Sequence, residues 1–503
     1  MVKGKKEDDS NSLQSVFELV EKIERKFEVD SIKLSDGTKI WNIIRVILCF
    51  YPWKKIGQAE KEKVSFNKRL YPIFKSFLPI PIPNKKIDFC AFSDTHSRRL
   101  RNEKYYDVYV DPLYELLGDK FFVFEWPMHS GLRRDYGKNV YSNNYIPAHL
   151  PKISMTFFNI MIYRYFKRKN YTVESEKVLL DVIRFFSKNT KIDENRIRNE
   201  IYYSITVFYN MKLFFIKLLD KINPKAIFIR CGYGRFHNAL SQACRELNIP
   251  SIELQHGNIT RYHVGYVKTL KSENRDCVPE YLLTYGSVFN NIVQDSSLFD
   301  DEKVIEIGFP FFENVKKSKP VIDKKVSEFI SNFKMVLLVT SQWTVADDIK
   351  EFIIEVSKIL KEKNKSIGII FKPHPRDINN YSNMKKHKNI LLADKYDDIY
   401  DLFKVIHIHS TVYSTSGLEA LAFGKPNIFI DIKKYGIKSM FEIIDEKTSY
   451  SADSPKRFIE KLSNIVTNYK SISKNALKKS EGFYKSNSYE NLEKFLNSIK
   501  IKI

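Results

Sequence analysis

Short apolar segments alternate with amphipathic segments along most of the chain after residue 85. In the amphipathic segments apolar residues recur every three or four positions, as Phe236, Ala239 and Leu240 do, which is typical of helices. This alternation predicts parallel sheets covered by helices on both faces. The predicted strands are residues 87–93, 226–230, 251–254, 281–284 and 304–307 in the first half, and 335–340, 367–371, 390–393, 405–408 and 428–431 in the second.

The strands form two groups, so we predict an α/β protein with two Rossmann-like domains. A chain of 503 residues is also longer than one hydrophobic core usually supports. The prolines of LPIPIPNKK and the turn residues of GFPFFENVKKSKP are typical of segments between domains. The predicted parts are a helical N-terminal extension 1–84, an N-terminal Rossmann-like domain 85–315, a C-terminal Rossmann-like domain 316–455 and C-terminal helices 456–503.

The formal net charge of +23 is spread over the whole chain. Such a surface attracts anions, among them nucleotides, anionic lipid headgroups and nucleic acid. No zinc-finger spacing or RNP-like aromatic motif accompanies the charge, so we expect no nucleic acid partner.

The five cysteines form no CxxC pair, which argues against a disulfide framework and a structural zinc site. No secretory segment follows the polar first residues, and a cytoplasmic location is expected. The apolar stretch 40–53 contains Arg45 and is too short to span a bilayer. Two interpretations of residues 41–55 stay open, peripheral contact with a membrane surface and packing against the N-terminal domain.

Two segments that follow predicted strands of the second half are suited to bind phosphate. In an open parallel sheet, ligands bind beyond the carboxyl ends of the strands. KPHPR follows residues 367–371 and places cations in a loop stiffened by prolines. HSTVYSTSGLEALAFGKP at 409–426 leads hydroxyl groups into a helix start, where backbone N–H groups are unpaired, although ordinary N-capping would use the same residues. The candidate nucleotide and phosphate ligands are Lys372, His374, Arg376, Ser410, Thr411, Ser414, Ser416, Gly417 and Glu419.

A histidine follows a strand of the first half, in the segment ELQHGNITRYHVGY at 253–266. An imidazole whose pKa is near neutrality can take a proton from an attacking hydroxyl, so His256 is the candidate base. Gln255 and His263 are candidate acceptor-binding residues beside it, and His263 is also an alternative base or a residue that only orients the loop. Glu253, in the same segment, could point into the sheet and support it through hydrogen bonds.

The segment SDTHSRR at 93–99 follows the first strand and offers a second candidate base, Asp94. Arg98 and Arg99 in the same segment could hold an anionic acceptor or a diphosphate. A solvated loop explains these residues equally well. The chain contains no GxxxxGK[ST] phosphate loop, no HExxH and no DxD motif, so we expect neither a metal nor a cofactor.

The paired motifs KPHPR and STxxxxxGLEALAFGKP resemble the C-terminal half of GT-B fold glycosyltransferases. The likeness is greatest to the bacterial capsule polysaccharide synthesis and export family and to the HP-motif sialyltransferases. QHG followed by HxGY is similar to the His-Gly motif of teichoic-acid glycerophosphotransferases. The tryptophan usual before that His-Gly is Gln255 here. The resemblance covers about residues 225–435, and it implies that His374 and the serines at 410–416 bind the nucleotide donor while His256 activates the acceptor.

We therefore predict a metal-independent bacterial glycosyltransferase of cell-envelope synthesis, one that makes capsule polysaccharide or lipopolysaccharide. It would move a sugar from a nucleotide-sugar donor, with CMP-sugars favoured, to a surface polysaccharide or lipid-linked glycan. The C-terminal domain would hold the donor and the N-terminal domain the acceptor. The alternatives are a CDP-polyol phosphotransferase of teichoic-acid type, a sugar-nucleotide 2-epimerase, and a non-catalytic protein that binds polyanions or glycans.

Overall fold

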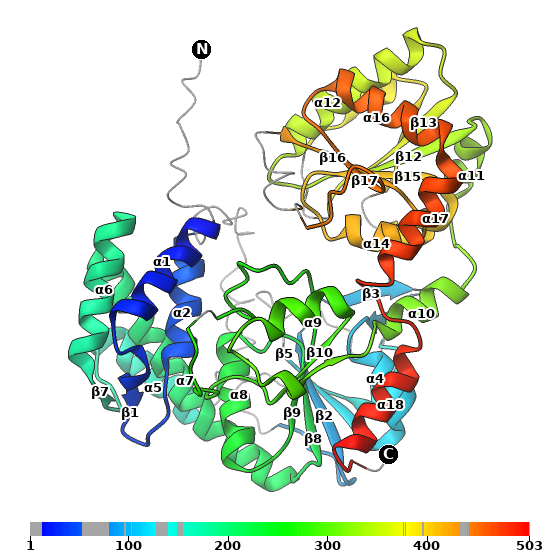
Figure 1. Ribbon diagram of the computed structural model, residues 1–503. Coiled ribbons are helices and arrows are strands. Elements are labelled where there is room, and N and C mark those ends of the chain that lie inside the picture. Colours follow the sequence, from blue (N-terminus) through cyan, green and yellow to red (C-terminus); the bar gives the residue numbers. More distant parts are fainter. Residues whose placement is uncertain are drawn as a thin grey trace. The chain divides into compact units, whose positions relative to one another are not determined.

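The computed structural model divides the chain into two compact units (Figure 1). Unit 1 comprises residues 1–285, 289–311 and 487–503, and unit 2 comprises residues 286–288 and 312–486. The structure describes residues 13–52, 80–94, 97–101, 103–126, 139–147, 154–268, 270–375, 377, 379–394, 397–432, 440 and 442–501.

Unit 1 contains a seven-stranded sheet in which every pair of neighbouring strands is parallel. Its strand order is β11-β10-β9-β8-β2-β5-β6, so the order along the sheet reverses between β2 and β8. The strands are β2 (Phe89–Asp94), β5 (Phe121–Trp126), β6 (Tyr145–Pro147), β8 (Ala226–Ile229), β9 (Ser251–Leu254), β10 (Tyr281–Thr284) and β11 (Val304–Glu306). The sequence prediction located five of these strands and missed β5 and β6.

Helices α4 (Asp111–Leu117) and α18 (Ser488–Ser498) pack on one face of this sheet. Leu492 and Phe495 of α18 share a buried cluster with Phe89, Phe228 and Ile252. The predicted C-terminal helices are thus divided, because α18 belongs to unit 1 whereas α16 (Pro455–Thr467) and α17 (Tyr469–Ser480) belong to unit 2. The remaining elements near the sheet are α8 (Arg235–Glu246), α9 (Ser287–Gln294) and the antiparallel ribbon of β3 (Arg98–Arg101) and β4 (Lys104–Asp107).

The helical part of unit 1 is built around α7 (Glu194–Ile222), the long helix that packs against α8. The Asp193 side chain caps the start of α7 by accepting from the backbone N–H of Arg196 at 2.9 Å. The helix ends at Asn223, which adopts the left-handed conformation with φ of 44°. Its other helices are α1 (Leu13–Lys26), α2 (Trp41–Phe50), α5 (Ser154–Phe166) and α6 (Glu176–Thr190), and β1 (Lys33–Leu34) pairs with β7 (Val173–Glu174).

Unit 2 contains a second parallel sheet, whose strand order is β14-β13-β12-β15-β16-β17. Numbered by their own sequence order the strands run 3-2-1-4-5-6, which is the Rossmann order. The strands are β12 (Met335–Thr340), β13 (Ile367–Lys372), β14 (Ile390–Leu392), β15 (Ile408–Thr411), β16 (Asn427–Ile430) and β17 (Ser449–Ala452). Two Rossmann-like units with helices in the N-terminal region confirm the predicted fold class.

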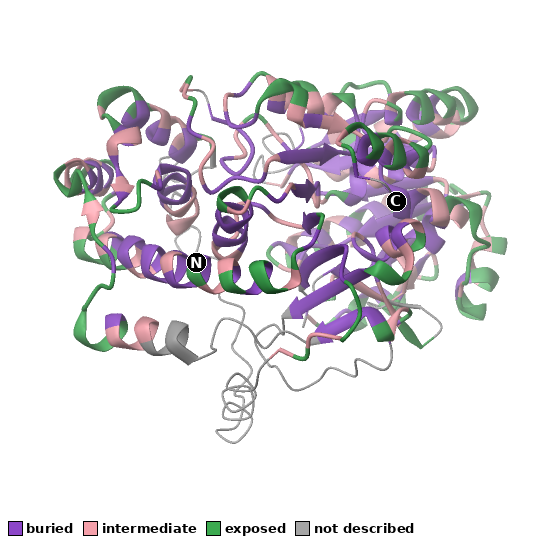
Figure 2. Cartoon of the chain, turned by 90° about the horizontal axis from the view of Figure 1, so that it is seen from below, coloured by how far each residue is buried: buried purple, intermediate pink, exposed green. Residues whose placement is uncertain are grey.

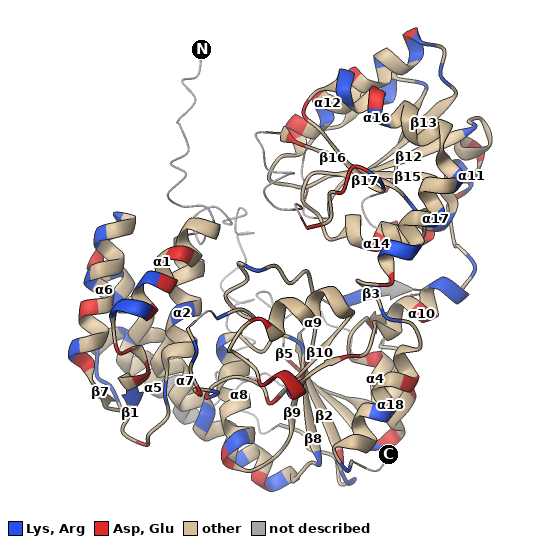
Figure 3. Cartoon of the chain, viewed as in Figure 1, with Lys and Arg blue, Asp and Glu red and all other residues tan. Residues whose placement is uncertain are grey.

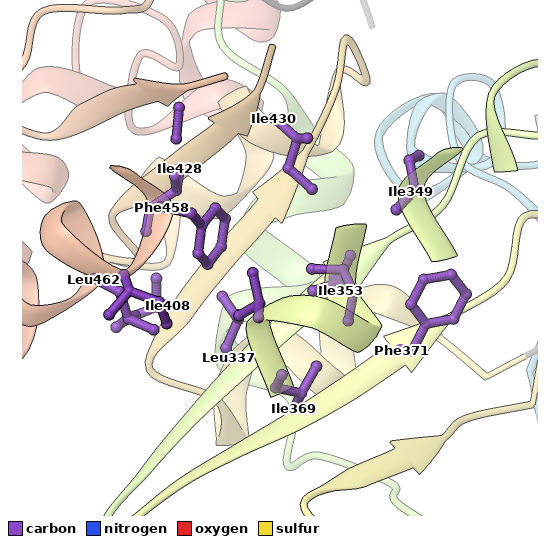
Figure 4. Close-up of a cluster of buried hydrophobic side chains, with 14 of the residues drawn as sticks. Leu337, Ile349, Ile353, Ile369, Phe371, Ile408, Ile428, Ile430, Phe458 and Leu462 are labelled. Atoms are coloured by element: carbon purple, nitrogen blue, oxygen red, sulfur yellow. The ribbon is translucent and has the colours of Figure 1, made fainter. Parts of the chain in front are cut away.

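Two helices cover one face of the unit 2 sheet and complete its core. Ile349 and Ile353 of α12 (Ala346–Glu362) and Phe458 of α16 (Pro455–Thr467) meet Leu337 and Ile369 of the sheet (Figure 4). Buried residues follow the strands, and exposed residues follow the outer helix turns (Figure 2). The other helices are α10 (Pro310–Lys317), α11 (Lys324–Ser331), α13 (Ile399–Val405), α14 (Ser416–Ala422) and α17 (Tyr469–Ser480).

Two local predictions were wrong. The segment 308–320 was predicted as turn and linker, but its middle forms α10, which begins at a proline as helices often do. Residues 405–408 were predicted as a strand, but Val405 ends α13 and β15 begins at Ile408. The Asp398 side chain caps the start of α13 (Ile399–Val405) by accepting from the N–H of Tyr400 at 2.9 Å.

None of the helices in the described part of the chain combines the length and the apolar character that crossing a membrane requires.

We expect Leu337→Ala to lower the free energy of unfolding of unit 2 by about 2–5 kcal/mol, because it leaves a cavity in a fully buried cluster. Leu477→Ala is the matched control, since Leu477 is 46% exposed and its loss should cost no more than about 0.5 kcal/mol. Urea unfolding of the full chain measures both. Equal losses in the two variants would contradict the assignment of Leu337 to the core.

Candidate active site

His256 lies just beyond β9, at the carboxyl end of the unit 1 sheet. The preceding Gln255 is buried and joins β9 to the end of β10, because its Oε1 accepts from the N–H of Tyr285 at 2.7 Å and its Nε2 donates to Gly257 O at 2.8 Å. Tyr109 Oη donates to the carbonyl of His256 at 2.7 Å. The backbone on both sides of the histidine is therefore held in place.

Two tyrosines contact the ring nitrogens of His256. Tyr266 Oη lies 3.0 Å from Nδ1, and Tyr233 Oη lies 3.1 Å from Nε2. Tyr266 Oη also donates to Glu253 Oε1 at 2.8 Å. Because the Tyr266 proton is directed to Glu253, its oxygen is an acceptor toward His256. The hydrogen bonds therefore favour the tautomer with a proton on Nδ1 and a basic lone pair on Nε2.

Glu253 is the buried end of this chain of hydrogen bonds. Its Oε1 also accepts from the N–H of Gly232 at 2.8 Å. Burial raises the pKa of Glu253 to about 8, and the hydrogen bonds from Gly232 and Tyr266 oppose that rise. A Cβ at Gly232 would lie 2.2 Å from Glu253 Oε2, so the carboxyl occupies the space that only glycine leaves. The supporting role that the sequence left open for Glu253 agrees with these contacts.

His263 belongs to the same aromatic cluster. Its ring centroid lies 4.8 Å from that of Tyr266 and 5.1 Å from that of Tyr233. Its Nδ1 accepts from the N–H of Gly265 at 3.2 Å. Burial lowers the pKa of His263 to about 4, which keeps this ring neutral at physiological pH. His263 is therefore suited to packing against the two tyrosines rather than to carrying charge.

Helix α2 fixes the loop that carries His263 and Tyr266. Arg45, which is 1% exposed, donates Nε to Glu24 Oε1 at 2.8 Å, and its terminal nitrogens donate to the carbonyls of Val264 and Val267. Phe50 of the same helix stacks on Tyr233, with ring centroids 6.1 Å apart. Residues 41–55 were interpreted either as a membrane contact or as a segment packed against the N-terminal domain. The described part, α2, packs against the rest of unit 1.

The segment at 97–99 is engaged in contacts of its own. Arg98 forms a buried ion pair with Glu125, and its guanidinium lies 5.2 Å from the ring centroid of Tyr145. The Arg99 guanidinium lies 5.9 Å from the ring centroid of Phe311. The side chain of Asp94 lies outside the described residues. The roles of Asp94, Arg98 and Arg99 stay predictions.

In unit 2, Lys372 and Thr340 end neighbouring strands and lie opposite each other in the β12–β13 register. The strand order reverses between β12 and β15, where a Rossmann-like sheet binds its ligands. Lys372 is buried, His374 is partly exposed in the loop after β13, and Arg376 lies outside the described residues. Cations at this edge are suited to an anionic ligand.

The hydroxyl residues within and just after β15 divide into two kinds. Ser410 and Thr411 are fully buried strand residues, whose Oγ atoms donate to Ile428 O at 2.6 Å and Thr340 O at 3.1 Å. Ser414 is partly exposed, and its Oγ accepts from the N–H of Ser416 at 3.2 Å. Among these hydroxyls the geometry therefore favours Ser414 for contact with a ligand.

The start of α14 packs closely against the sheet. Ser416 Oγ lies 3.1 Å from Thr340 Oγ1, and Glu419 accepts from Tyr400 Oη at 3.1 Å. A Cβ at Gly417 would lie 2.6 Å from the ring of Phe429, so the close approach requires glycine.

Sequence analysis overlooked the residues that follow β12. Gln342 Oε1 accepts from the N–H groups of Val412 and Tyr413, at 3.3 and 3.1 Å, and so joins the loops on the two sides of the strand-order reversal. Ser341 donates its N–H to Lys372 O at 2.9 Å. Strand 335–340 was predicted, and ligands bind beyond the carboxyl ends of such strands. The same rule that selected residues 372 and 410 would therefore also have selected Ser341 and Gln342.

The two Rossmann-like units carry His256 just beyond a strand of one sheet and a lysine with several hydroxyl residues at the carboxyl edge of the other. The family model of CDP-Glycerol:Poly(glycerophosphate) glycerophosphotransferase matches residues 239–500. The chain belongs to this family.

Solved structures share the fold at low sequence identity. A protein from Listeria monocytogenes described as a UDP-N-acetylglucosamine 2-epimerase has a TM-score of 0.50 and 12% identity, and the likeness covers 83% of this chain and 96% of that one. For the wall teichoic acid polymerase TagF the TM-score is 0.45 at 13% identity, covering 87% and 97%. For the glycotransferase of kitacinnamycin it is 0.49 at 10% identity, covering 82% and 99%. No curated protein sequence matches the chain.

We expect Glu253→Gln to flatten the dependence of stability on pH. The folded-state pKa of Glu253, about 8, lies above its ordinary value of 4.5, so the folded protein keeps a proton that the unfolded chain has lost. Its contribution is complete below pH 4.5 and is lost as pH rises toward 8, at up to about 1.4 kcal/mol per pH unit. Glutamine keeps an acceptor for Gly232 and Tyr266 but does not ionise.

Urea unfolding of the unchanged protein and of Glu253→Gln, at a series of pH values between 4.5 and 8, measures how the free energy of unfolding of each depends on pH. Asp111, whose pKa burial also raises to about 8, contributes equally to both proteins and cancels. Parallel pH profiles for the two proteins would contradict the raised pKa of Glu253.

Proposed function

We propose that this protein transfers a polyol phosphate from a CDP-linked donor to a hydroxyl group of a polyol-phosphate or glycan acceptor. The observation that carries the proposal is the histidine of the His-Gly step, held with a basic Nε2, within a chain that the glycerophosphotransferase family model matches over residues 239–500.

The proposed step is a single displacement at phosphorus. The acceptor hydroxyl oxygen attacks the β-phosphorus of the donor, and its proton passes to His256 Nε2. The bond between the β-phosphorus and the bridging oxygen breaks, and CMP leaves with that oxygen and its electron pair. Tyr233 Oη, which lies 3.1 Å from Nε2, has to turn away or be displaced when the acceptor hydroxyl binds.

We assign donor binding to unit 2. Lys372, His374 and Ser414 lie at the carboxyl edge of its sheet, where cations and hydroxyls would neutralise the charge that develops on the leaving CMP. Glu419 is the candidate ligand of the ribose. The acceptor roles proposed for Gln255 and His263 are indirect, since their contacts place and pack the loops around His256.

Sugar transfer from a CMP-sugar is the second candidate, and the KPHPR and GLEALAFGKP motifs favour it. Both reactions release CMP, so nucleotide release alone does not separate them. The family description names glycerophosphate transfer, and for that reason we place polyol phosphate transfer first.

We expect the protein to move radioactive phosphate from CDP-glycerol labelled at the β-phosphorus into a glycerophosphate polymer. A parallel incubation with a CMP-sugar labelled in the sugar tests the second candidate. His256→Ala should lower kcat by about 100- to 10,000-fold, the usual contribution of a general base. His387→Ala, in unit 2, is the matched control and should keep full activity.

Transfer from the CMP-sugar alone would overturn the polyol proposal and leave the transferase class intact. Full activity of His256→Ala would move the base to Asp94 or to another residue. No turnover with either donor would contradict both candidates.

We expect Tyr266→Phe to lower kcat by about tenfold with little change in KM. The substitution keeps the ring but removes the oxygen that fixes the Nδ1 proton of His256, a loss of about one hydrogen bond. The pH profile of kcat should change as well, because Glu253 and His256 are no longer connected. Tyr262→Phe, on the same loop, is the control; a purely structural role for Tyr266 would leave the pH profile unchanged.

A further inference from the structure

The end of helix α5 exposes two adjacent aromatic side chains. Tyr165 is 68% exposed and Phe166 is 79% exposed. Among the described residues they are the only aromatic members of the set of exposed large hydrophobic side chains. Each would normally be buried, and exposed apolar groups that lie side by side often mark an interaction surface.

The structure holds this end of α5 firmly. Tyr163 is buried, and Asn159 Nδ2 and Asn170 Nδ2 both donate to Asn210 Oδ1 of α7, at 2.8 and 2.9 Å. Tyr171 Oη donates to Tyr202 O at 3.0 Å, also on α7. The helix ends because Lys167 adopts the left-handed conformation with φ of 56° and donates its N–H to Tyr163 O. Residues 164–169 therefore form a fixed tip between anchored residues on both sides.

The tip is strongly basic. The segment 164–170 contains Arg164, Lys167, Arg168 and Lys169 and no acidic residue. All of its residues are exposed. Of the nearby carboxylates, Glu176 pairs with Lys169 at 3.0 Å and Glu174 pairs with Lys33 at 3.1 Å. Lys and Arg also outnumber Asp and Glu on the rest of the chain, but there they are spread over the outer helices (Figure 3).

We propose that the tip of α5, residues 164–169, docks on an anionic lipid surface. Tyrosine and phenylalanine insert into the headgroup region, where one side of each ring is apolar and the other can stay hydrated. Arg164, Lys167 and Arg168 contact the negatively charged headgroups around the inserted rings. This surface is independent of the proposed reaction and differs from the α2 segment that the sequence suggested for membrane contact.

Charge and chemistry favour lipid over the other occupants of such a surface. A second copy of this tip would bring four basic residues against four like charges, which is repulsive. A nucleic acid would satisfy the cations, but exposed Phe166 on a helix end is suited to an apolar layer rather than to the edges of paired bases.

The experiment is co-sedimentation of the full chain with two kinds of vesicle, phosphatidylglycerol mixed with phosphatidylcholine, and phosphatidylcholine alone. We expect binding to the anionic vesicles that weakens as salt is added. Tyr165→Ser with Phe166→Ser should weaken it by about tenfold or more, because two rings lose their burial. Arg164→Gln with Arg168→Gln should weaken it by roughly 25-fold, at about fivefold for each basic residue.

The controls remove an exposed apolar side chain and two exposed basic charges in unit 2. Val321→Ser removes a side chain that is 76% exposed, and Lys363→Gln with Lys365→Gln removes two exposed charges. Both should bind as the unchanged protein does, and all variants should keep their turnover of water-soluble acceptors. Failure of the unchanged protein to bind anionic vesicles, or equal losses in tip and control variants, would overturn the proposal. So would a change in oligomeric state, measured by light scattering, in the Tyr165 and Phe166 variant, because it would identify a second copy as the occupant.

Discussion

The hydrogen bonds of the buried Arg45 guanidinium hold the loop next to His256, the candidate base. Removing such a group from water is costly unless its donors are paired, and here Glu24 and the carbonyls of Val264 and Val267 accept from it. Trp41 Nε1 donates to the same oxygen of Glu24 at 2.9 Å. The carbonyls belong to the loop that carries Tyr266, and Tyr266 contacts His256. Helices α1 and α2, which carry Glu24 and Arg45, therefore help to position the histidine. Deleting these helices would therefore remove the N-terminal extension and also the hydrogen bonds that hold the loop.

The hydrogen bonds from Glu253 through Tyr266 to His256 give each group one task. A buried carboxyl with a raised pKa cannot serve as a permanent charge, and it acts instead as an acceptor that directs the Tyr266 proton away from the histidine. Neutral His263 fills the space beside both tyrosines without competing for protons. The result is a histidine with one basic nitrogen, which is what proton abstraction from a hydroxyl needs.

The sequence was sufficient to predict most strands of both sheets, because buried parallel strands are continuous apolar runs, as at 251–254 and 335–340, but it missed β5, β6 and β17. It failed at β15, where buried His409, Ser410 and Thr411 interrupt the apolar pattern and are satisfied by Asn427, Ile428 and Thr340. Motif spacing predicted roles for His256 and Lys372. It could not identify Arg45, since that side chain contacts Val264, which is 219 residues away in the sequence. Contacts of that range leave no local pattern.

The two units share a strand order but use the point of its reversal differently. In unit 1 the end of β2 is occupied by the chain itself, because Asp107 accepts from Ser93 Oγ at 2.7 Å and from Ser97 Oγ at 2.6 Å, while Arg98 pairs with Glu125. His256 lies after β9, on the far side of β8 from that point. In unit 2 the reversal lies between strands that end at Thr340 and Thr411, next to Lys372 and partly exposed Ser414. Among the described residues, paired polar groups thus lie at the end of β2 in unit 1, whereas a lysine and a partly exposed serine lie beside the reversal in unit 2. This difference supports the proposed division of roles, in which His256 of unit 1 takes the proton and unit 2 binds the nucleotide phosphate.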